Sequence, residues 1–288
     1  MTAPLRRFES TVPYYARYRL GYPARLIERV IALVRLEPGD AVLDLGTGPG
    51  LLAIPFAAAG FKVTAADPEP AMLEAARQAA RDAGVALELW LGGSNELAAG
   101  MGPFRLVTMG RSFHWMDRAS TLAMLEQLVS PEGAVALFHD DAPKTAENAW
   151  HDVMREVSDR YGRGAEPHVV VFQAADYRTH VSYLLDSAFC SLDGVSVVIR
   201  HSITVDEIVG RAFSMSTCSR EKLGDRAAAF EDELRAALRE QSPSGMFIEI
   251  AELTALVATR ARGASPSRCV ESGATRLVGD TDSRPANR

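Results

Sequence analysis

The sequence is poor in cysteine, lacks a long apolar run and carries no excess of positive charge. Its three cysteines, Cys190, Cys218 and Cys269, form no close pair and no metal-ligand spacing, which suits a reducing cytoplasm. No stretch approaches the ~20 apolar residues that cross a bilayer, and no apolar signal core follows the first residues. A formal net charge of −6 disfavours broad nucleic-acid binding, which needs a basic face. We therefore expect a cytoplasmic protein without a nucleic-acid or membrane partner, and the sequence does not indicate its oligomeric state.

The most informative segment is residues 41–50, Ala-Val-Leu-Asp-Leu-Gly-Thr-Gly-Pro-Gly. A short apolar run ends in Asp44, and Gly46, Gly48 and Gly50 follow before an apolar, helix-like stretch at residues 51–59. This pattern predicts a buried strand that turns sharply into a helix. Bare backbone and the free N–H groups of a helix N-terminus let a ligand approach closely. The segment therefore predicts a cofactor-binding loop, although a glycine-rich turn without a ligand is an alternative.

Two cofactors compete for this loop. A relaxed dinucleotide fingerprint matches at Gly48, Gly50 and Ala53, but small residues are common after any strand-to-helix turn. The loop also closely resembles the first motif of class I S-adenosylmethionine-dependent methyltransferases, acid-apolar-Gly-x-Gly-x-Gly, which residues 44–50 fit at every position. In that family the acid and the loop N–H groups complement the ammonium and carboxylate of the cofactor. A pyrophosphate would gain nothing from an acid at Asp44.

The second predicted strand, residues 61–67, ends in Asp67, about 20 residues after the first glycine. An acid there accepts the ribose hydroxyls in NAD proteins and methyltransferases alike, or it caps the next helix, predicted at residues 70–83. The resemblance implies that Pro68 or Met72 lies near the adenine, and that Ser94 and Asn95 meet its amino edge unless Glu96 replaces them. The predicted cofactor residues are Asp44, Gly46, Thr47, Gly48, Gly50, Asp67, Pro68, Met72, Ser94, Asn95, Gly110 and Arg111.

The fourth predicted strand, residues 104–109, opens into Gly-Arg-Ser-Phe-His-Trp-Met-Asp at residues 110–117. Strand carboxyl ends face the ligand crevice of open α/β sheets, so we expect these side chains near the methyl donor. The Phe-His-Trp run resembles the small-molecule branch that includes trans-aconitate methyltransferase. The Asn/Asp-Pro-Pro-Tyr signature of nucleic-acid amino methylation is absent. His114 is the candidate general base, although we favour a role as pocket wall.

Further acceptor-side candidates come from residues 8–23 and from the end of the fifth predicted strand, residues 134–138. The first segment resembles the Tyr…Arg-Pro-x-Tyr-Pro segment of the same branch, with Leu20 where proline is usual, and typically folds across the cofactor cleft. His139, Asp140 and Asp141 could hold a metal, but we favour a solvated loop and expect no metal. The predicted acceptor pocket consists of Tyr14, Tyr15, Arg19, Phe113, His114, Trp115 and His139.

Late strands at residues 195–204 and 246–258 match the antiparallel sixth and seventh strands of the methyltransferase sheet. The resemblance thus implies an α/β, Rossmann-like seven-stranded mixed sheet with helices on both faces and a partial lid. We divide the chain into an N-terminal cap segment and helix (1–36), an S-adenosylmethionine-binding core (37–141), a lid insertion (142–180), the C-terminal part of the sheet (181–260) and a disordered tail (261–288), which holds little to bury.

These observations predict S-adenosylmethionine-dependent methyl transfer to a small organic molecule, with oxygen, nitrogen, carbon or a carboxylate as acceptor. Two alternatives stay open. An NAD-linked oxidoreductase is disfavoured by Asp44 and by the late strands. A non-catalytic S-adenosylmethionine-binding regulator would show the same motifs, because methyl transfer need not rely on any one base.

Overall fold

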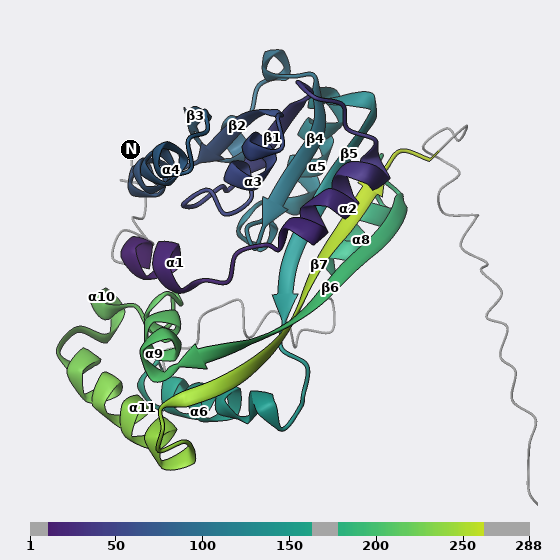
Figure 1. The fold of residues 1–288 in the computed structure, drawn as a ribbon. Coiled ribbons are helices and arrows are strands. Elements are labelled where there is room, and N and C mark those ends of the chain that lie inside the picture. Colours follow the sequence, from purple (N-terminus) through teal and green to yellow (C-terminus); the bar gives the residue numbers. More distant parts are fainter. Residues whose placement is uncertain (1–10, 163–177, 262–288) are drawn as a thin grey trace, which may run out of the picture.

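The structure, a computed structural model, describes residues 11–162 and 178–261. The predicted disordered tail and much of the predicted lid therefore lie outside the described residues. The described chain forms one seven-stranded sheet with the strand order β3-β2-β1-β4-β5-β7-β6 (Figure 1). This confirms the predicted α/β fold with a mixed sheet.

Six of the seven strands run in one direction, five of them as parallel neighbours, and one runs against them. The parallel strands are β1 (Ala41–Leu45), β2 (Lys62–Asp67), β3 (Glu88–Leu91), β4 (Phe104–Gly110) and β5 (Val129–Asp141). The strand β7 (Met246–Thr259) pairs antiparallel with both β5 and β6 (Ser191–Thr204). Because β7 lies between them, β6 runs in the same direction as β5. The expectation that both late strands run against the sheet is therefore wrong for β6.

Helices cover both faces of the sheet. On one face, α2 (Ala24–Val34) and α3 (Ala53–Ala58) share a hydrophobic core with the strands, and α4 (Pro70–Asp82) packs against β2, β3 and α3. On the other face, α5 (Arg118–Leu128) and α8 (His180–Leu185) close a second core. Short 3₁₀ turns occur at Ser94–Glu96, Ala99–Met101, Phe113–Trp115, Glu147–Ala149 and Gly224–Arg226.

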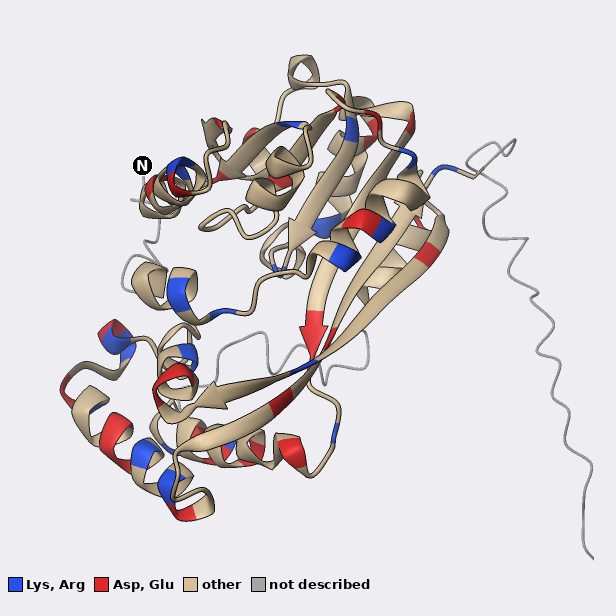
Figure 2. Ribbon diagram, viewed as in Figure 1, with Lys and Arg blue, Asp and Glu red and all other residues tan. Residues whose placement is uncertain are grey.

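The strands β6 and β7 continue beyond the sheet and carry a second lobe (Figure 1). This lobe consists of α6 (Trp150–Tyr161), α9 (Val205–Phe213), α10 (Arg220–Leu223) and α11 (Ala227–Gln241), which form a third hydrophobic core with the outer ends of the two strands. Only α6 comes from the predicted lid insertion. Acidic and basic residues alternate along α11, and acidic residues mark the carboxyl end of β5 between the lobes (Figure 2).

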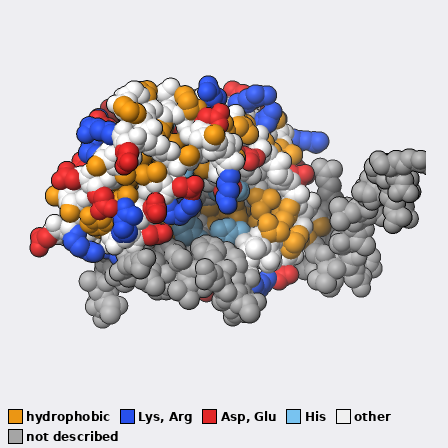
Figure 3. Space-filling view, turned by 90° about the horizontal axis from the view of Figure 1, so that it is seen from below, with side chains coloured by type: hydrophobic (Ala, Val, Ile, Leu, Met, Phe, Trp, Pro, Cys, Tyr) orange, Lys and Arg blue, Asp and Glu red, His pale blue; other side chains and the backbone are white. Residues whose placement is uncertain are grey.

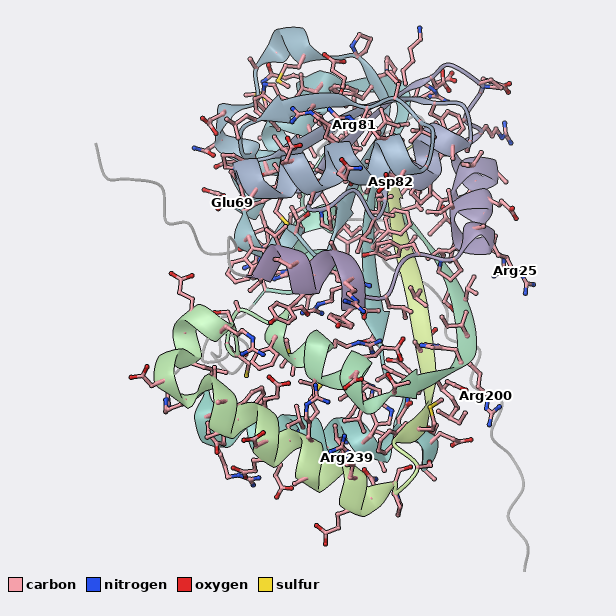
Figure 4. All side chains as sticks on the ribbon, turned by 60° about the vertical axis from the view of Figure 1, so that its left-hand side comes forward. Arg25, Glu69, Arg81, Asp82, Arg200 and Arg239 are labelled. Atoms are coloured by element: carbon pink, nitrogen blue, oxygen red, sulfur yellow. The ribbon has the colours of Figure 1, made fainter. Side chains whose placement is uncertain are left out.

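The N-terminal residues 11–22, which we call the N-terminal strap, lie between the two lobes. The strap begins with α1 (Val12–Tyr18), which contacts α4 of the sheet domain and α9 of the second lobe (Figure 4). The ring of Tyr18 lies so close to Gly210 that a Cβ there would be 2.3 Å from it. The absence of a side chain at Gly210 therefore lets α1 pack onto α9.

Several element boundaries differ from expectation. The strand β5 begins at Val129 instead of Ala134, and β6 begins at Ser191 instead of Val195. Cys218 is free and buried. No helix within the described ranges is long and apolar enough to cross a membrane. The same residues contain no cluster of histidine, cysteine and carboxylate side chains suited to a metal ion.

Candidate active site

A narrow cavity of about 20 Å³ lies at the carboxyl edge of β1 and β4, beneath the strap. It brings together four of the predicted cofactor-loop residues, the predicted residues Gly110 and Arg111 at the end of β4, and two tyrosines of the strap. The lining residues are Tyr15, Tyr22, Asp44, Gly46, Thr47, Gly48, Leu51, Leu52, Gly110 and Arg111.

Asp44 is a buried carboxylate at the end of β1. It accepts hydrogen bonds from the hydroxyls of Thr47 at 2.6 Å and of Thr108 on β4 at 2.8 Å. Burial raises the pKa of Asp44 to about 6, although these hydrogen bonds act in the opposite direction. An ionised carboxylate held in this way is suited to a ligand cation, which would compensate its burial.

The glycine loop is shaped by its neighbours and by its backbone conformation. Gly46 has a φ of +74°, and a Cβ there would lie 2.5 Å from the Cβ of Ser112, so no other residue fits without a shift. Gly48, with a φ of +55°, donates its N–H to Asp67 at 2.8 Å. Gly50 faces Ile54 and Ala76 instead of the cavity, so in this structure it serves the packing of the following helix.

Asp67 ends β2 and holds the glycine loop against the start of α4. One carboxylate oxygen accepts the N–H of Gly48 at 2.8 Å, and the other accepts the N–H of Glu69 at 2.9 Å. Burial raises the pKa of Asp67, while the two backbone hydrogen bonds lower it. Each oxygen keeps a second lone pair, so the carboxylate can still accept ribose hydroxyls. Asp67 is not the N-cap of α4, which is Glu69, so the capping alternative is wrong, and the ribose contact stays a prediction.

The residues predicted near the adenine lie next to one another but outside the cavity. Met72 is buried on α4, with its sulfur 3.9 Å from the position that a Cβ of Gly48 would take. Pro68 adjoins Gly93, which precedes the turn that contains Ser94 and Asn95. Glu96 accepts the N–H of Gly93 at 2.8 Å, so it caps its own turn.

Arg111 and Tyr22 aim unused hydrogen-bond donors into the cavity. Arg111 has a left-handed backbone, with a φ of +55°, and pairs with Asp140 while its Nη2 donates to the carbonyl of Leu20 at 2.8 Å. Its guanidinium lies 4.9 Å from the centre of the Tyr22 ring. Burial raises the pKa of Tyr22, so its hydroxyl stays protonated. Within the described residues, Arg111 Nη1 and Tyr22 Oη are buried and have no hydrogen-bond partner.

These orphaned donors test whether the cavity fits the methionine end of S-adenosylmethionine. Buried donors without partners are costly, and a ligand carboxylate would satisfy both. Asp44 on the same cavity wall offers the complementary charge for the ammonium of an amino acid. The donor set of the cavity therefore fits a zwitterion, and it does not require a phosphate.

The predicted acceptor residues of the strap separate onto two sides of α1. Tyr15 lines the cavity, and the guanidinium of Arg19 lies 5.2 Å from the centre of its ring. Tyr14 instead packs on Phe213, with 5.3 Å between ring centres, and its hydroxyl accepts a hydrogen bond from Arg220. Tyr14 therefore faces a different groove, of about 630 Å³, between the strap and the second lobe.

The Phe-His-Trp run does not reach the cavity. Ser112 donates its hydroxyl to the carbonyl of Leu45 at 2.7 Å, and the following turn places Phe113 in the core on the opposite face of the sheet, 2% exposed. Phe113 is thus a core residue instead of a pocket residue. His114 and Trp115 are exposed with their rings 4.9 Å apart.

His139, the remaining predicted acceptor residue, lies 3.5 Å from the carboxylate of Asp141. His139 is exposed and is not among the residues that line the cavity. Seen from below, the described surface has a hollow with histidine and hydrophobic side chains (Figure 3). A role of these side chains toward an acceptor stays a prediction.

Sequence reasoning missed four residues of the site. Tyr22, Leu51 and Leu52 line the cavity, and Thr108 holds Asp44 from the neighbouring strand. Thr108 gave a usable signal, because a polar residue inside the apolar run of β4 needs a buried partner. The other three look like ordinary core residues in the sequence.

Comparison with known proteins finds similarity to methyltransferases. A family described as a methyltransferase domain matches residues 42–133. An uncharacterized methyltransferase of Mycobacterium tuberculosis (strain ATCC 25618 / H37Rv) is 30% identical over 160 residues, which are 56% of this chain and 60% of the relative. A ubiquinone biosynthesis O-methyltransferase of Aromatoleum aromaticum is 39% identical over 99 residues, 34% of this chain and 42% of the relative. The chain thus spans 60% or less of the length of these relatives.

The fold agrees with this assignment. The crystal structure of a SAM-dependent methyltransferase from Thiobacillus denitrificans, in complex with S-adenosyl-L-homocysteine, has a TM-score of 0.52 and 18% identity. The match covers 91% of this chain and 100% of that chain, and at this identity it shows the fold. Residues 42–133 thus match a methyltransferase domain, and the described chain has the fold of the class I S-adenosylmethionine-dependent methyltransferases.

Proposed function

We propose that the protein transfers the methyl group of S-adenosylmethionine to a small organic molecule at the carboxyl edge of β1 and β4. The observation that carries the proposal is the cavity in which Asp44 and the orphaned donors of Tyr22 and Arg111 face the glycine loop. This set complements both charges of an amino acid end. The match of residues 42–133 to a methyltransferase domain supports the same cofactor.

The chain's own residues would hold the cofactor and orient the acceptor. Asp44 would pair with the ammonium, Tyr22 and Arg111 with the carboxylate, and Asp67 with the ribose. When bound, S-adenosylmethionine supplies a methyl group on a positively charged sulfur. Among the described residues, those that line the cavity include no histidine. The site therefore acts chiefly by proximity and orientation on an acceptor that is already nucleophilic.

Two observations support a small molecule as the methyl acceptor: the strap and second lobe that lie over the site, and the name of one similar protein. The strap and the second lobe lie against the carboxyl edge, which limits access for a macromolecule (Figure 1). The Aromatoleum relative is named for ubiquinone biosynthesis, in which the methylated group belongs to a small molecule. The acceptor atom is not determined by either observation.

The size of the cavity implies that the strap moves when the cofactor binds. The cavity of about 20 Å³ has room for a water molecule but is far too small for the cofactor. Tyr15 and Tyr22 of the strap close the cavity from above. Cofactor binding must therefore displace these side chains or the segment that carries them.

Calorimetry and a turnover assay test the proposal together. We expect S-adenosylmethionine and S-adenosylhomocysteine to bind with micromolar dissociation constants and NAD not to bind. Incubation with S-adenosylmethionine and a panel of phenols, amines and carboxylic acids should release S-adenosylhomocysteine with at least one acceptor. Tighter binding of NAD would refute the cofactor assignment. Cofactor binding without turnover on any acceptor would instead indicate a non-catalytic regulator.

A further inference from the structure

Three arginines from three different elements come together where the strap meets the second lobe. Arg19 comes from the strap, Arg111 follows β4, and Arg211 belongs to α9 of the second lobe. Arg19 donates to the hydroxyl of Ser214, which in turn donates to the carbonyl of Arg211, and Arg111 donates to the carbonyl of Leu20 next to Arg19. Burial and the charges of Arg111 and Arg211 lower the pKa of Arg19, while Tyr15 and Asp140 raise it. Like charges gather here in a space that is partly shielded from water.

Two of these arginines have carboxylate partners. Arg111 pairs with Asp140 at the end of β5. Arg211 pairs with Glu249 on β7, which is 2% exposed and lies 3.0 Å from His201 Nε2. Burial would raise the pKa of Glu249, but His151, Arg211 and His201 together outweigh it and lower the pKa to about 2. Glu249 is therefore ionised, and each of the two carboxylates faces one guanidinium.

Arg19, the third arginine, has no such carboxylate partner among the described residues. Its Nε donates to the hydroxyl of Ser214 at 2.8 Å, and its guanidinium stacks over Tyr15. No carboxylate of the described residues forms an ion pair with it, and its two terminal nitrogens make no hydrogen bond within those residues. Nε is thus fixed while the fork of Nη1 and Nη2 is free, the geometry with which arginine binds a carboxylate through two hydrogen bonds.

The carboxylate of the cofactor is the less suitable partner for this fork. Tyr22 Oη and Arg111 Nη1 already offer two orphaned donors inside the cavity, beside Asp44. Arg19 is not among the cavity-lining residues; its guanidinium lies over the ring of Tyr15, which does line the cavity. A second anion, on the acceptor, would meet Arg19 while the rest of the acceptor lies next to the cofactor.

We propose that Arg19 binds a carboxylate of the methyl acceptor, in a subsite that Ser214 of the second lobe positions and that Arg111 and Arg211 make electropositive. This inference rests on the proposed function, because it assigns the charge of that acceptor. Arg19 is a specificity-determining residue in this arrangement. An unpaired, partly buried charge lowers the stability of the folded protein. Ligand binding explains why the chain carries such a charge at Arg19.

The test measures carboxylate binding separately from turnover. The full-length protein, saturated with S-adenosylhomocysteine, is titrated calorimetrically with succinate and with benzoate, each compared with its neutral amide at matched ionic strength. We expect at least one carboxylate to bind more tightly than its amide. Arg19→Gln should weaken that binding about tenfold or more, the range for a charge-assisted hydrogen bond. Arg19→Lys should bind with intermediate affinity, because it keeps the charge and loses the fork.

Arg17→Gln is the matched control, since it removes the same charge from the same strap, two residues away. Arg17 is exposed, and its guanidinium lies over the ring of Tyr18, 5.2 Å from its centre. We expect this variant to bind the carboxylate as the wild type does. The melting temperature of Arg19→Gln without ligand should equal or exceed that of the wild type, which a residue kept for stability would not show. If Arg19→Gln does not fold, the carboxylate affinity of Arg19→Lys is compared with that of the wild type instead.

The outcomes separate this inference from the proposed function. Carboxylates bound no better than their amides would overturn the inference. So would an Arg19→Gln variant that loses affinity for S-adenosylhomocysteine but keeps it for the carboxylate, because Arg19 would then serve the cofactor. Carboxylate binding that depends on Arg19, without turnover of any acid, would sustain the subsite and contradict the proposed function.

Discussion

Asp44 should make cofactor binding weaken as the solution is acidified below pH 6. The carboxylate pairs with an ammonium only when ionised, and burial raises its pKa to about 6 in the folded protein. If only the ionised form binds, the competent fraction falls from nearly all at pH 7.5 to about one tenth at pH 5. The dissociation constant of S-adenosylhomocysteine should therefore rise about tenfold over this range.

The same shift fixes how stability depends on pH. Because the folded pKa is raised, the stabilising contribution of Asp44 is present below about pH 4 and is lost as the pH rises through about 6. A shift of about two units corresponds to ~3 kcal/mol. Asp44→Asn removes this cost, and the hydroxyls of Thr47 and Thr108 can donate or accept, so they can pair with the amide. The variant should gain up to about 3 kcal/mol of unfolding free energy at pH 7.5.

Two titrations check this reasoning. Calorimetry with S-adenosylhomocysteine from pH 5 to 7.5 measures the affinity, and urea unfolding at both ends of the range measures the stability. Asp44→Asn should bind weakly at every pH and lose the pH dependence, while Asp193→Asn, at an exposed position of β6, should behave as the wild type. Affinity that stays constant down to pH 5 would refute the role of the Asp44 carboxylate. An Asp44→Asn variant whose affinity depends on pH as strongly as that of the wild type would also refute this role.

Three further predictions follow from the site and its surroundings. Asp67→Ala should weaken S-adenosylhomocysteine binding by about 1.5–3 kcal/mol in calorimetry, because it removes a charged acceptor and the hydrogen bond to Gly48. Unchanged affinity would mean that Asp67 serves only to hold the backbone of Gly48 and Glu69. Glu249→Gln should lower the free energy of unfolding at pH 7 by about 3–5 kcal/mol, because Arg211 loses its buried partner. Since the pKa of Glu249 is lowered to about 2, the wild type should lose this contribution only between about pH 4.5 and 2, and equal stability of the two proteins at pH 7 would contradict the ion pair. His114→Gln should reduce kcat/KM about tenfold or less, whereas a loss of 10²–10⁴ with intact cofactor affinity would identify His114 as the base.

The sequence predicted those parts of the site that follow from local pattern. An apolar run ending in Asp44 and a glycine loop specify a strand, a turn and an exposed backbone, and the parallel strands bring their carboxyl ends to one edge. The start of β5 was not predictable in this way, because Pro131 and Gly133 look like the end of an element. In the structure, Val129 pairs with Phe104 and the pairing resumes at Ala134 with Leu106, so an irregularity absorbs the intervening residues.

Side-chain direction was the part that sequence could not give. Tyr14 and Tyr15 were assigned to one pocket, but residues 12–18 form a helix, in which neighbours point about 100° apart. They therefore face different spaces. The burial of Phe113 depends on the bond between Ser112 and Leu45, which joins residues far apart in the chain. The second lobe likewise assembles from two segments that are separated in the chain, so its core is visible only in three dimensions.

The pairing of β6 with β7 determines how the two lobes can move. The two strands stay in register from Ser191 with Thr259 to Thr204 with Met246, a ladder of fourteen residues that is about 47 Å long. No flexible linker interrupts this ladder between the sheet domain and the second lobe. Displacement of one lobe against the other must bend or twist a continuous two-stranded ribbon, which resists elastically and restores the resting arrangement. The ribbon thus sets a default spacing between Arg211 and Arg111, to which the lobes return after each ligand leaves.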